Sequence, residues 1–227
     1  MIRKHSRFIP IVVLLLLIGM FLGFGGHHLL TLEELARHRN YLQDQVQGNM
    51  IRSIIIFAAI YVAVVAGSLP GGALLSLAAG FLFGQWLGTM LVVASATLGA
   101  VLLFLLVDTA FGAILKEKAG PWFQKIRAGF QDNAISYMLF LRLVPIFPFF
   151  AVNIVGAMLG IRLTVFGLTT ALGILPGSFV FVSAGVGLDA ILETGEILNR
   201  ETQIAFVGLG LVSLLPVGYK FLSKRRH

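Results

Sequence analysis

The sequence predicts an all-α polytopic membrane protein with two re-entrant helical hairpins at corresponding places in its two halves and about four to five spanning helices. Of its 227 residues, 58% are hydrophobic and 12% are charged, whereas soluble domains carry about 25% charged residues. Several uncharged runs are long enough to cross a bilayer core of ~30 Å. Two further apolar segments, 70–84 and 137–160, are interrupted by proline and glycine, which is typical of re-entrant structure.

The composition and the motifs also exclude several kinds of site and disfavour several classes of function. The chain has no cysteine, which excludes disulfides and thiolate metal sites. Its net charge of +7 comes from basic residues at the termini and in loops, the distribution that membrane orientation produces, so we expect no nucleic-acid partner. No phosphate-binding glycine-rich loop and no Ser-His-Asp arrangement is present, so we expect neither an enzyme nor a cofactor. His27, His28 and His38 lack a tight metal-ligand spacing with Glu33 and Glu34, and a solvated loop is favoured over a metal site.

Residues 1–68 are predicted to hold an anchor, a surface helix and a second span. The apolar run 8–26 is longer than the ~7–15 residues of a signal-peptide core, so we expect a retained anchor that begins in the cytoplasm. Thr31 and Glu34 form a capping box that starts an amphipathic helix at the membrane surface. The run 54–69 is the second span.

Residues 69–188 are the predicted core. As one helix, 70–84 would extend ~22 Å, less than the ~30 Å of the hydrocarbon core. Residues 87–107 carry no charge and form a span, and a polar connection follows in which Pro121 opens an interfacial helix. The long apolar run 163–188 is the next span.

Residues 189–227 hold a last span, 204–222, and a basic tail. Basic residues at both ends place both termini in the cytoplasm, which requires an even number of crossings. The runs 8–26, 54–69, 87–107, 163–188 and 204–222 give five. Two solutions stay open: one short segment crosses the membrane, or 54–69 and the segment after it do not span as counted.

The segment 136–160 is the predicted working part of the molecule. Pro145 and Pro148 remove two backbone donors and break the helical ladder. Arg142 lies in the same apolar run, where a charge costs several kcal/mol unless it finds a partner or water. Broken backbone at membrane depth is tolerated only under a cover of protein or in a water-filled cavity. We therefore predict a half-buried segment with one cation at its mouth.

Three residues are the candidate substrate-binding set: Arg142, Asn153 and Asp108. A guanidinium offers a planar set of donors that suits phosphate, although an arginine can also snorkel to the interface. Asn153 could bond freed backbone groups or a headgroup. Asp108 ends a span, where capping is the simpler role, but an Asp108–Arg142 pair would make both buried charges tolerable.

The two short segments echo each other. Pro70 precedes a Gly80-x-x-x-Gly84 motif and a span, and Pro148 precedes Gly156-x-x-x-Gly160 and a span. Such pairs point to a site at a repeat interface, while close helix packing at small residues is the alternative. The residues predicted to shape the hairpins are Pro70, Gly71, Gly80, Gly84, Pro145, Pro148, Gly156, Gly160 and Pro176.

These motifs together resemble the SNARE-associated Golgi protein family, also called the VTT-domain or DedA superfamily, over about residues 69–187. The resemblance is greatest to bacterial members related to the yeast Golgi Tvp proteins. The motifs that carry it are Leu69-Pro-Gly-Gly72, Gly80-Phe-Leu-Phe-Gly84, Leu98-Gly-Ala100, Phe140-Leu-Arg-Leu-Val-Pro145 with Pro148, Asn153, and Gly173-x-x-Pro176-Gly177.

The resemblance implies two oppositely oriented re-entrant hairpins that meet in mid-membrane. It also implies movement of lipids, namely phospholipid scrambling in eukaryotic members and return of undecaprenyl phosphate in bacterial ones. Two positions depart from the family pattern. Asp108 stands where the family usually has an arginine, and the stretch that ends at Ser68 lacks the acidic residue of the DedA branch.

We therefore expect a multi-pass protein of the bacterial inner membrane that translocates or scrambles an anionic lipid, either a phospholipid or an undecaprenyl-phosphate-like carrier. Its expected partners are membrane lipids, and a homo-oligomer stays open. An ion-coupled solute transporter would instead depend on Asp108. A non-transporting membrane organiser would depend on the helix face from Trp122 to Phe130.

Overall fold

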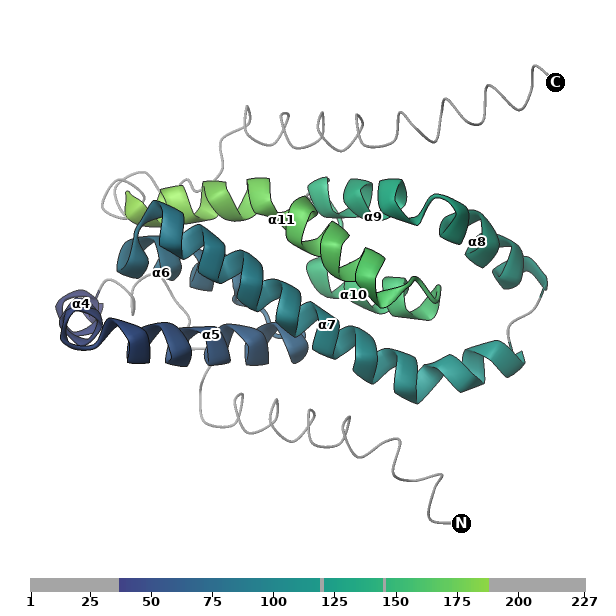
Figure 1. The fold of residues 1–227 in the computed structure, drawn as a ribbon, viewed down its shortest axis with the longest axis horizontal. Helices are drawn as coiled ribbons and strands as arrows, with labels where there is room; N and C mark the ends of the chain where they lie inside the picture. Colours follow the sequence, from purple (N-terminus) through teal and green to yellow (C-terminus); the bar gives the residue numbers. More distant parts are fainter. Residues whose placement is uncertain (1–36, 119–120, 145, 188–227) are drawn as a thin grey trace, which may run out of the picture. The chain divides into compact units, whose positions relative to one another are not determined.

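The computed structural model describes residues 37–118, 121–144 and 146–187, and every regular element within these ranges is an α-helix (Figure 1). The helices are α4 (Arg39–Gly48), α5 (Met50–Ala66), α6 (Gly72–Phe83), α7 (Gln85–Lys118), α8 (Pro121–Asp132), α9 (Ala134–Leu143), α10 (Phe149–Met158) and α11 (Leu163–Val186). The all-helical prediction is confirmed for this part of the chain. The helices form two compact units, the first up to Ala100 and again from Gly177, the second over Val101–Pro176.

Two stretches are long and apolar enough to cross a membrane, Gln85–Thr109 in α7 and Leu163–Val186 in α11. The predicted runs 87–107 and 163–188 are thus continuous helices where the structure describes them, the second as far as Val186. A third candidate is the pair Tyr41–Gly48 and Met50–Ala66, which is bent by 119°. The predicted spans 8–26 and 204–222 lie outside the described residues.

Two boundaries differ from the prediction. Helix α7 continues beyond the predicted span 87–107 as far as Lys118, so it includes the first charged residues of the predicted polar connection. The segment 70–84 is not a hairpin in itself, because it forms the single 12-residue helix α6. The chain reverses at either end of α6 instead, because Tyr61 on α5 lies beside Ser76, and a Cβ at Gly88 on α7 would meet the Ala79 carbonyl.

In the first unit, α6 runs antiparallel to α5. The Tyr61 hydroxyl lies 3.0 Å from Ser76 Oγ near the start of α6, and Phe57 meets Phe83 near its end with ring centroids 5.3 Å apart. The turn between these helices contains Pro70 and Gly71, and Gly71 has φ 135°. Backbone of that conformation favours glycine, so this turn is readable from the sequence.

Close backbone contacts hold the first unit together. A Cβ atom at Gly80 would meet the carbonyl oxygen of Val182, and one at Gly185 would meet the carbonyl oxygen of Leu77. Helix α6 and the end of α11 therefore approach each other through glycine on both sides. Small residues allow two helices to come this close. In a membrane the burial of apolar surface drives little helix association, so close packing of this kind is what stabilises the contact.

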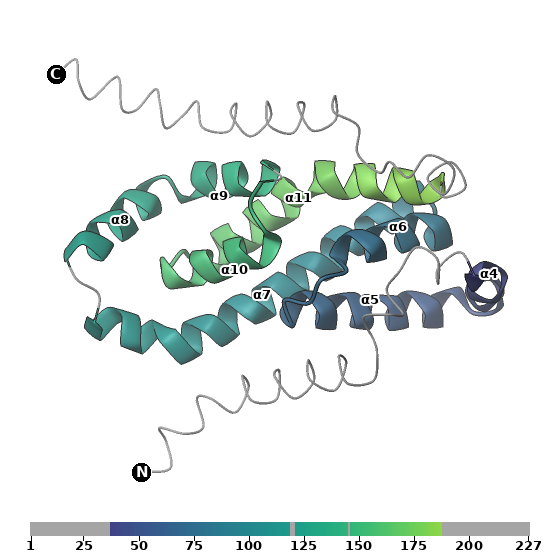
Figure 2. The ribbon, with the colours of Figure 1, turned by 180° about the vertical axis from the view of Figure 1, so that it is seen from behind.

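In the second unit, the predicted break in the segment 136–160 is confirmed. Helix α9 ends at Leu143 and α10 begins at Phe149, after the N-cap residue Pro148 (Figure 2). Pro145 lies outside the described residues. Pro176, predicted to shape a hairpin, lies inside α11 instead.

Helix α8 begins at Pro121 as predicted, and it caps the end of α10. Arg127 Nε donates to the Leu159 carbonyl at 3.1 Å. Gln131 Nε2 donates to the carbonyls of Leu159 and Gly160, both at 3.0 Å. The last carbonyls of a helix lack partners within the helix and carry partial negative charge, so a cation and an amide here stabilise α10.

The motif pattern shared by the two short segments, a proline followed by Gly-x-x-x-Gly, has a structural counterpart. Helices α6 and α10 each follow a proline, and the glycine after each has a left-handed φ, 74° at Gly84 and 65° at Gly160. Four residues earlier, Gly80 packs on the backbone of Val182, and a Cβ at Gly156 would lie 3.0 Å from the Phe166 ring. Each of these glycines thus lets another element pack closely against it within its own unit. Close packing at small residues was the alternative to a site at a repeat interface.

Gly160→Ala should lower the stability of the second unit by about 1–2 kcal/mol, because an L side chain is strained at a left-handed φ. The new Cβ would also displace the Arg127 guanidinium from the end of α10. Gly160→Asn should show less of the backbone strain, since asparagine tolerates this backbone, although its Cβ displaces Arg127 as well. Thermal unfolding in detergent measures the difference. Gly129→Ala on α8, which has open space around it, is the control. Equal melting temperatures for Gly160→Ala and the control would contradict the prediction.

Candidate functional site

The candidate site is built around Arg142 in the last turn of α9. Its Nη2 group donates to Asn153 Oδ1 on α10 at 2.6 Å and to Thr170 Oγ1 on α11 at 2.8 Å. Both acceptors are fully buried. Gly173 lets α11 come close, because a Cβ there would collide with Arg142 Cβ. Three helices of the second unit therefore meet at one cation.

Most of the donors in this cluster have no acceptor. Arg142 Nε and Nη1 and Asn153 Nδ2 are buried without a hydrogen-bond partner among the described residues. All three are N–H groups, so the unfilled capacity is for acceptors only. A buried donor without a partner costs about 1–3 kcal/mol, more when it is charged. A site whose N–H donors lack acceptors is suited to an anionic ligand that supplies several acceptor atoms.

Two aromatic rings complete the surroundings of the cation. The Arg142 guanidinium carbon lies 4.5 Å from the centroid of the Phe149 ring and 5.3 Å from that of the Phe166 ring. Both distances are within the range in which the face of an aromatic ring attracts a cation.

The structure brings together two of the three predicted substrate-binding residues, Arg142 and Asn153. It does not bring in Asp108, which is exposed on α7, and the Asp108–Arg142 pair that was the alternative to a capping role does not form. Arg142 has neutral hydrogen-bond partners instead. The exposed carboxylate of Asp108 does not reach the buried guanidinium, whose Nε and Nη1 groups stay without an acceptor among the described residues.

Sequence reasoning missed Thr170, Phe149 and Phe166. A signal for them existed, because Phe149 precedes Asn153 by four residues and Phe166 precedes Thr170 by four. Residues so spaced share one face of a helix.

No other described buried group has this character. In the first unit the buried hydroxyls of Tyr61 and Ser76 bond each other, and Ser76 also donates to the Gly72 carbonyl at 2.8 Å. Thr97 Oγ1 has no partner but carries no charge. Within 37–118, 121–144 and 146–187, no group of three or more His, Cys, Asp or Glu side chains could hold a metal ion.

Comparison with known proteins places the chain in a family. The VTT domain model matches residues 69–187, just over half of the chain. Transmembrane protein 41 homolog of Dictyostelium discoideum is 31% identical over 77% of this chain and 53% of its own length. Transmembrane protein 41B of Mus musculus is 29% identical over 78% of this chain and 62% of its own length.

The Homo sapiens form of Transmembrane protein 41B gives the same values as the mouse protein, 29%, 78% and 62%. The chain thus spans a little over half of the length of these curated relatives. No solved structure matches it. The matched region contains the whole Arg142 cluster, and the relatives are named as transmembrane proteins. This chain is a membrane protein and belongs to the VTT-domain family, within the SNARE-associated Golgi and DedA superfamily.

Proposed function

We propose that the chain moves an anionic lipid between the leaflets of a membrane, and that Arg142 binds the phosphate of the headgroup. The observation that carries the proposal is the buried guanidinium, which has no carboxylate partner and no acceptor for its Nε and Nη1 groups within the part of the chain that the structure describes. Guanidinium groups recognise phosphate through several directed hydrogen bonds together with charge. The activity is transport and needs no covalent step, so no catalytic residue is assigned.

The broken helix supplies a reason for a lipid path at this site. Helix α10 has 10 residues and is ~15 Å long, about half of the hydrocarbon thickness. Its beginning and the end of α9 leave backbone polar groups outside any helical ladder. Large exposed apolar side chains lie in the break, Ile146 at 76% and Phe147 at 39% exposure. A headgroup could use the polar backbone while its tails stay against these side chains.

The proposal extends to where the protein works. A bacterial inner membrane with both termini in the cytoplasm fits the basic ends of the chain. Either a phospholipid or a polyprenyl phosphate carrier offers the anionic phosphate that the cluster would bind.

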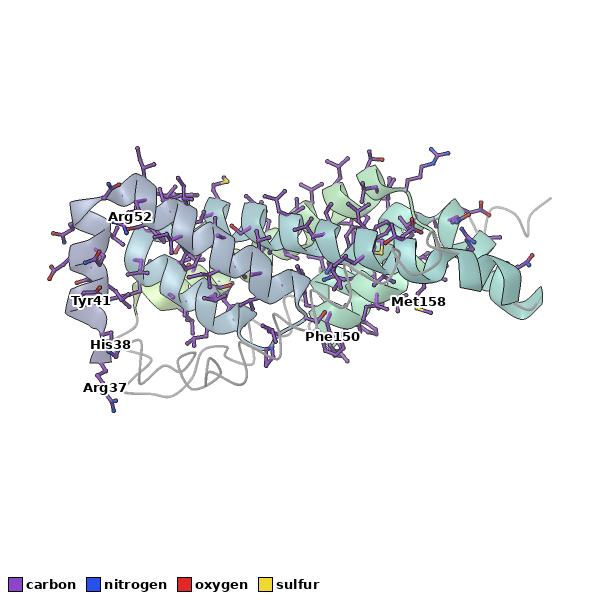
Figure 3. All side chains as sticks on the ribbon, turned by 90° about the horizontal axis from the view of Figure 1, so that it is seen from below. Arg37, His38, Tyr41, Arg52, Phe150 and Met158 are labelled. Atoms are coloured by element: carbon purple, nitrogen blue, oxygen red, sulfur yellow. The ribbon has the colours of Figure 1, made fainter. Side chains whose placement is uncertain are left out.

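The test is a translocation assay on purified protein in liposomes that contain fluorescent phosphatidylglycerol or a labelled polyprenyl phosphate. Arg142→Ala should slow exchange at least roughly tenfold, because hydrogen bonds to a charged group contribute about 1.5–3 kcal/mol each. Arg52→Ala is the matched control. Arg52 is exposed at the start of α5 (Figure 3), and its loss should change the rate by no more than about twofold.

Equal rates for wild type and Arg142→Ala, in protein that elutes as a folded species, would overturn the role of Arg142. Absence of exchange in wild type with both lipids would overturn the function itself. Solute uptake that falls with Asp108→Asn would then favour the ion-coupled transporter. Loss of cellular function on substitution of the Trp122–Phe130 face, with Arg142→Ala active, would favour the membrane organiser.

A further inference from the structure

The surroundings of Arg142 are built twice from the same pattern. Helix α10 contributes Phe149 and, four residues on, Asn153, while α11 contributes Phe166 and, four residues on, Thr170. Each helix therefore presents one aromatic ring and one neutral oxygen on the same face, one turn apart. We call these four residues the arginine holder.

The holder fixes the guanidinium from several sides. Its two oxygens accept from Nη2 at 2.6 and 2.8 Å, and its two rings lie 4.5 and 5.3 Å from the guanidinium carbon. Thr170 donates its own proton to the Phe166 carbonyl at 2.7 Å. Its hydroxyl is thus oriented to accept from Arg142.

The packing behind the holder leaves the Phe166 ring little freedom. Phe166 is fully buried, its ring lies 4.6 Å from that of Phe104, and Gly156 makes room for one of its edges. Phe149 is only half-buried, so it is the member of the pair that can be substituted without disturbing the core.

We propose that the arginine holder positions Arg142 without neutralising it, so that Phe149 and Phe166 are positioning residues for anion binding. A carboxylate would orient the guanidinium equally well, but it would also cancel the charge that attracts a phosphate. Aromatic faces and neutral oxygens stabilise the cation and leave its net charge in place. Asp108 is exposed on α7 and does not pair with Arg142, which agrees with a guanidinium that is held by neutral groups. The inference rests on the proposed function, which it deepens.

The test compares two neighbouring phenylalanines on α10. Phe149→Leu removes the ring beside the guanidinium, whereas Phe150→Leu removes a ring that is 48% exposed on the same helix (Figure 3). Phe149→Leu should slow translocation of phosphatidylglycerol roughly 3- to 30-fold, the range that a cation–π contact supplies. Phe150→Leu should stay within about twofold of wild type. Phe149→Tyr should restore the rate, because it restores the aromatic face.

A second readout separates the holder from transport. Inorganic phosphate or phosphatidylglycerol, titrated into protein in neutral detergent, should raise the melting temperature of wild type, since a ligand that binds only the folded state stabilises it. Phe149→Leu should require a higher concentration of either ligand for the same shift, and Phe150→Leu should not. If Phe149→Leu yields no folded protein, Phe149→Met takes its place.

The outcomes distinguish the two claims. Equal behaviour of Phe149→Leu and Phe150→Leu in both assays overturns the holder and leaves lipid transport standing. Ligand shifts that weaken only in Phe149→Leu, with no lipid exchange by wild type, support the holder and overturn transport. Loss of activity that Phe149→Tyr does not restore reduces Phe149 to a packing residue and overturns the inference.

Discussion

Gly185→Ala should destabilise the protein by up to about 3 kcal/mol, although it adds only one methyl group. The new Cβ would collide with backbone atoms of Leu77 on α6, and backbone cannot rotate aside as a side chain can. Overpacking of this kind typically costs about 1–3 kcal/mol. Gly80→Ala should have a similar effect from the other helix, because its Cβ would meet the carbonyl group of Val182.

Gly177→Ala is the matched control on the same helix, since nothing lies within 4 Å of a Cβ there. It should be neutral or stabilise by up to ~1 kcal/mol, the helix-propensity difference between the two residues. Thermal unfolding in detergent gives the comparison. A melting temperature for Gly185→Ala equal to that of Gly177→Ala would show that α6 and α11 do not approach this closely.

Asn153→Asp should leave the protein folded and at least as stable as wild type, yet slow lipid translocation by roughly tenfold or more. The substitution changes no heavy-atom count, and it places a carboxylate where Asn153 Oδ1 now accepts from Arg142 at 2.6 Å. The attraction to a cation that is already buried and unpaired offsets the cost of burying the new carboxylate. The same partner competes with any phosphate for that cation. Both quantities are measured on one preparation. The translocation rate should fall, while the melting temperature should rise or stay unchanged.

Asn49→Asp controls for the change in net charge. Asn49 is exposed and caps α5 by accepting from the Arg52 backbone N–H at 3.0 Å, a role that aspartate fills equally well. Full activity in Asn153→Asp would contradict the view that Arg142 must stay unneutralised. Low stability together with low activity would indicate a structural role for Asn153 alone.

Much of the local structure could be predicted from the sequence, because proline and glycine act within a few residues of their position. Pro148 ends the gap before α10, and Gly84 and Gly160 end α6 and α10 with backbone that other residues rarely adopt. Arg142 also stood out, since a charge within an apolar run needs an explanation whatever the fold.

The faces of the helices could not be predicted in the same way. Phe166 and Leu168 are both large and apolar and nearly adjacent, yet Phe166 is fully buried while Leu168 is 65% exposed. In a soluble helix the exposed residue would be polar and would reveal the face. Lipid accepts apolar side chains as readily as a protein interior does, so this signal disappears in a membrane helix.

The sequence by itself therefore determined most of the helices, the break before α10 and the importance of Arg142, the cation just before that break. Only the tertiary structure decided the partners of that cation, which are Asn153 and Thr170 and not Asp108. It also decided that 70–84 is one helix with a reversal at each end. The physical reason is the same in both cases. Helix formation depends on neighbours in the chain, whereas the partner of a buried charge is chosen by packing between segments that lie far apart in sequence.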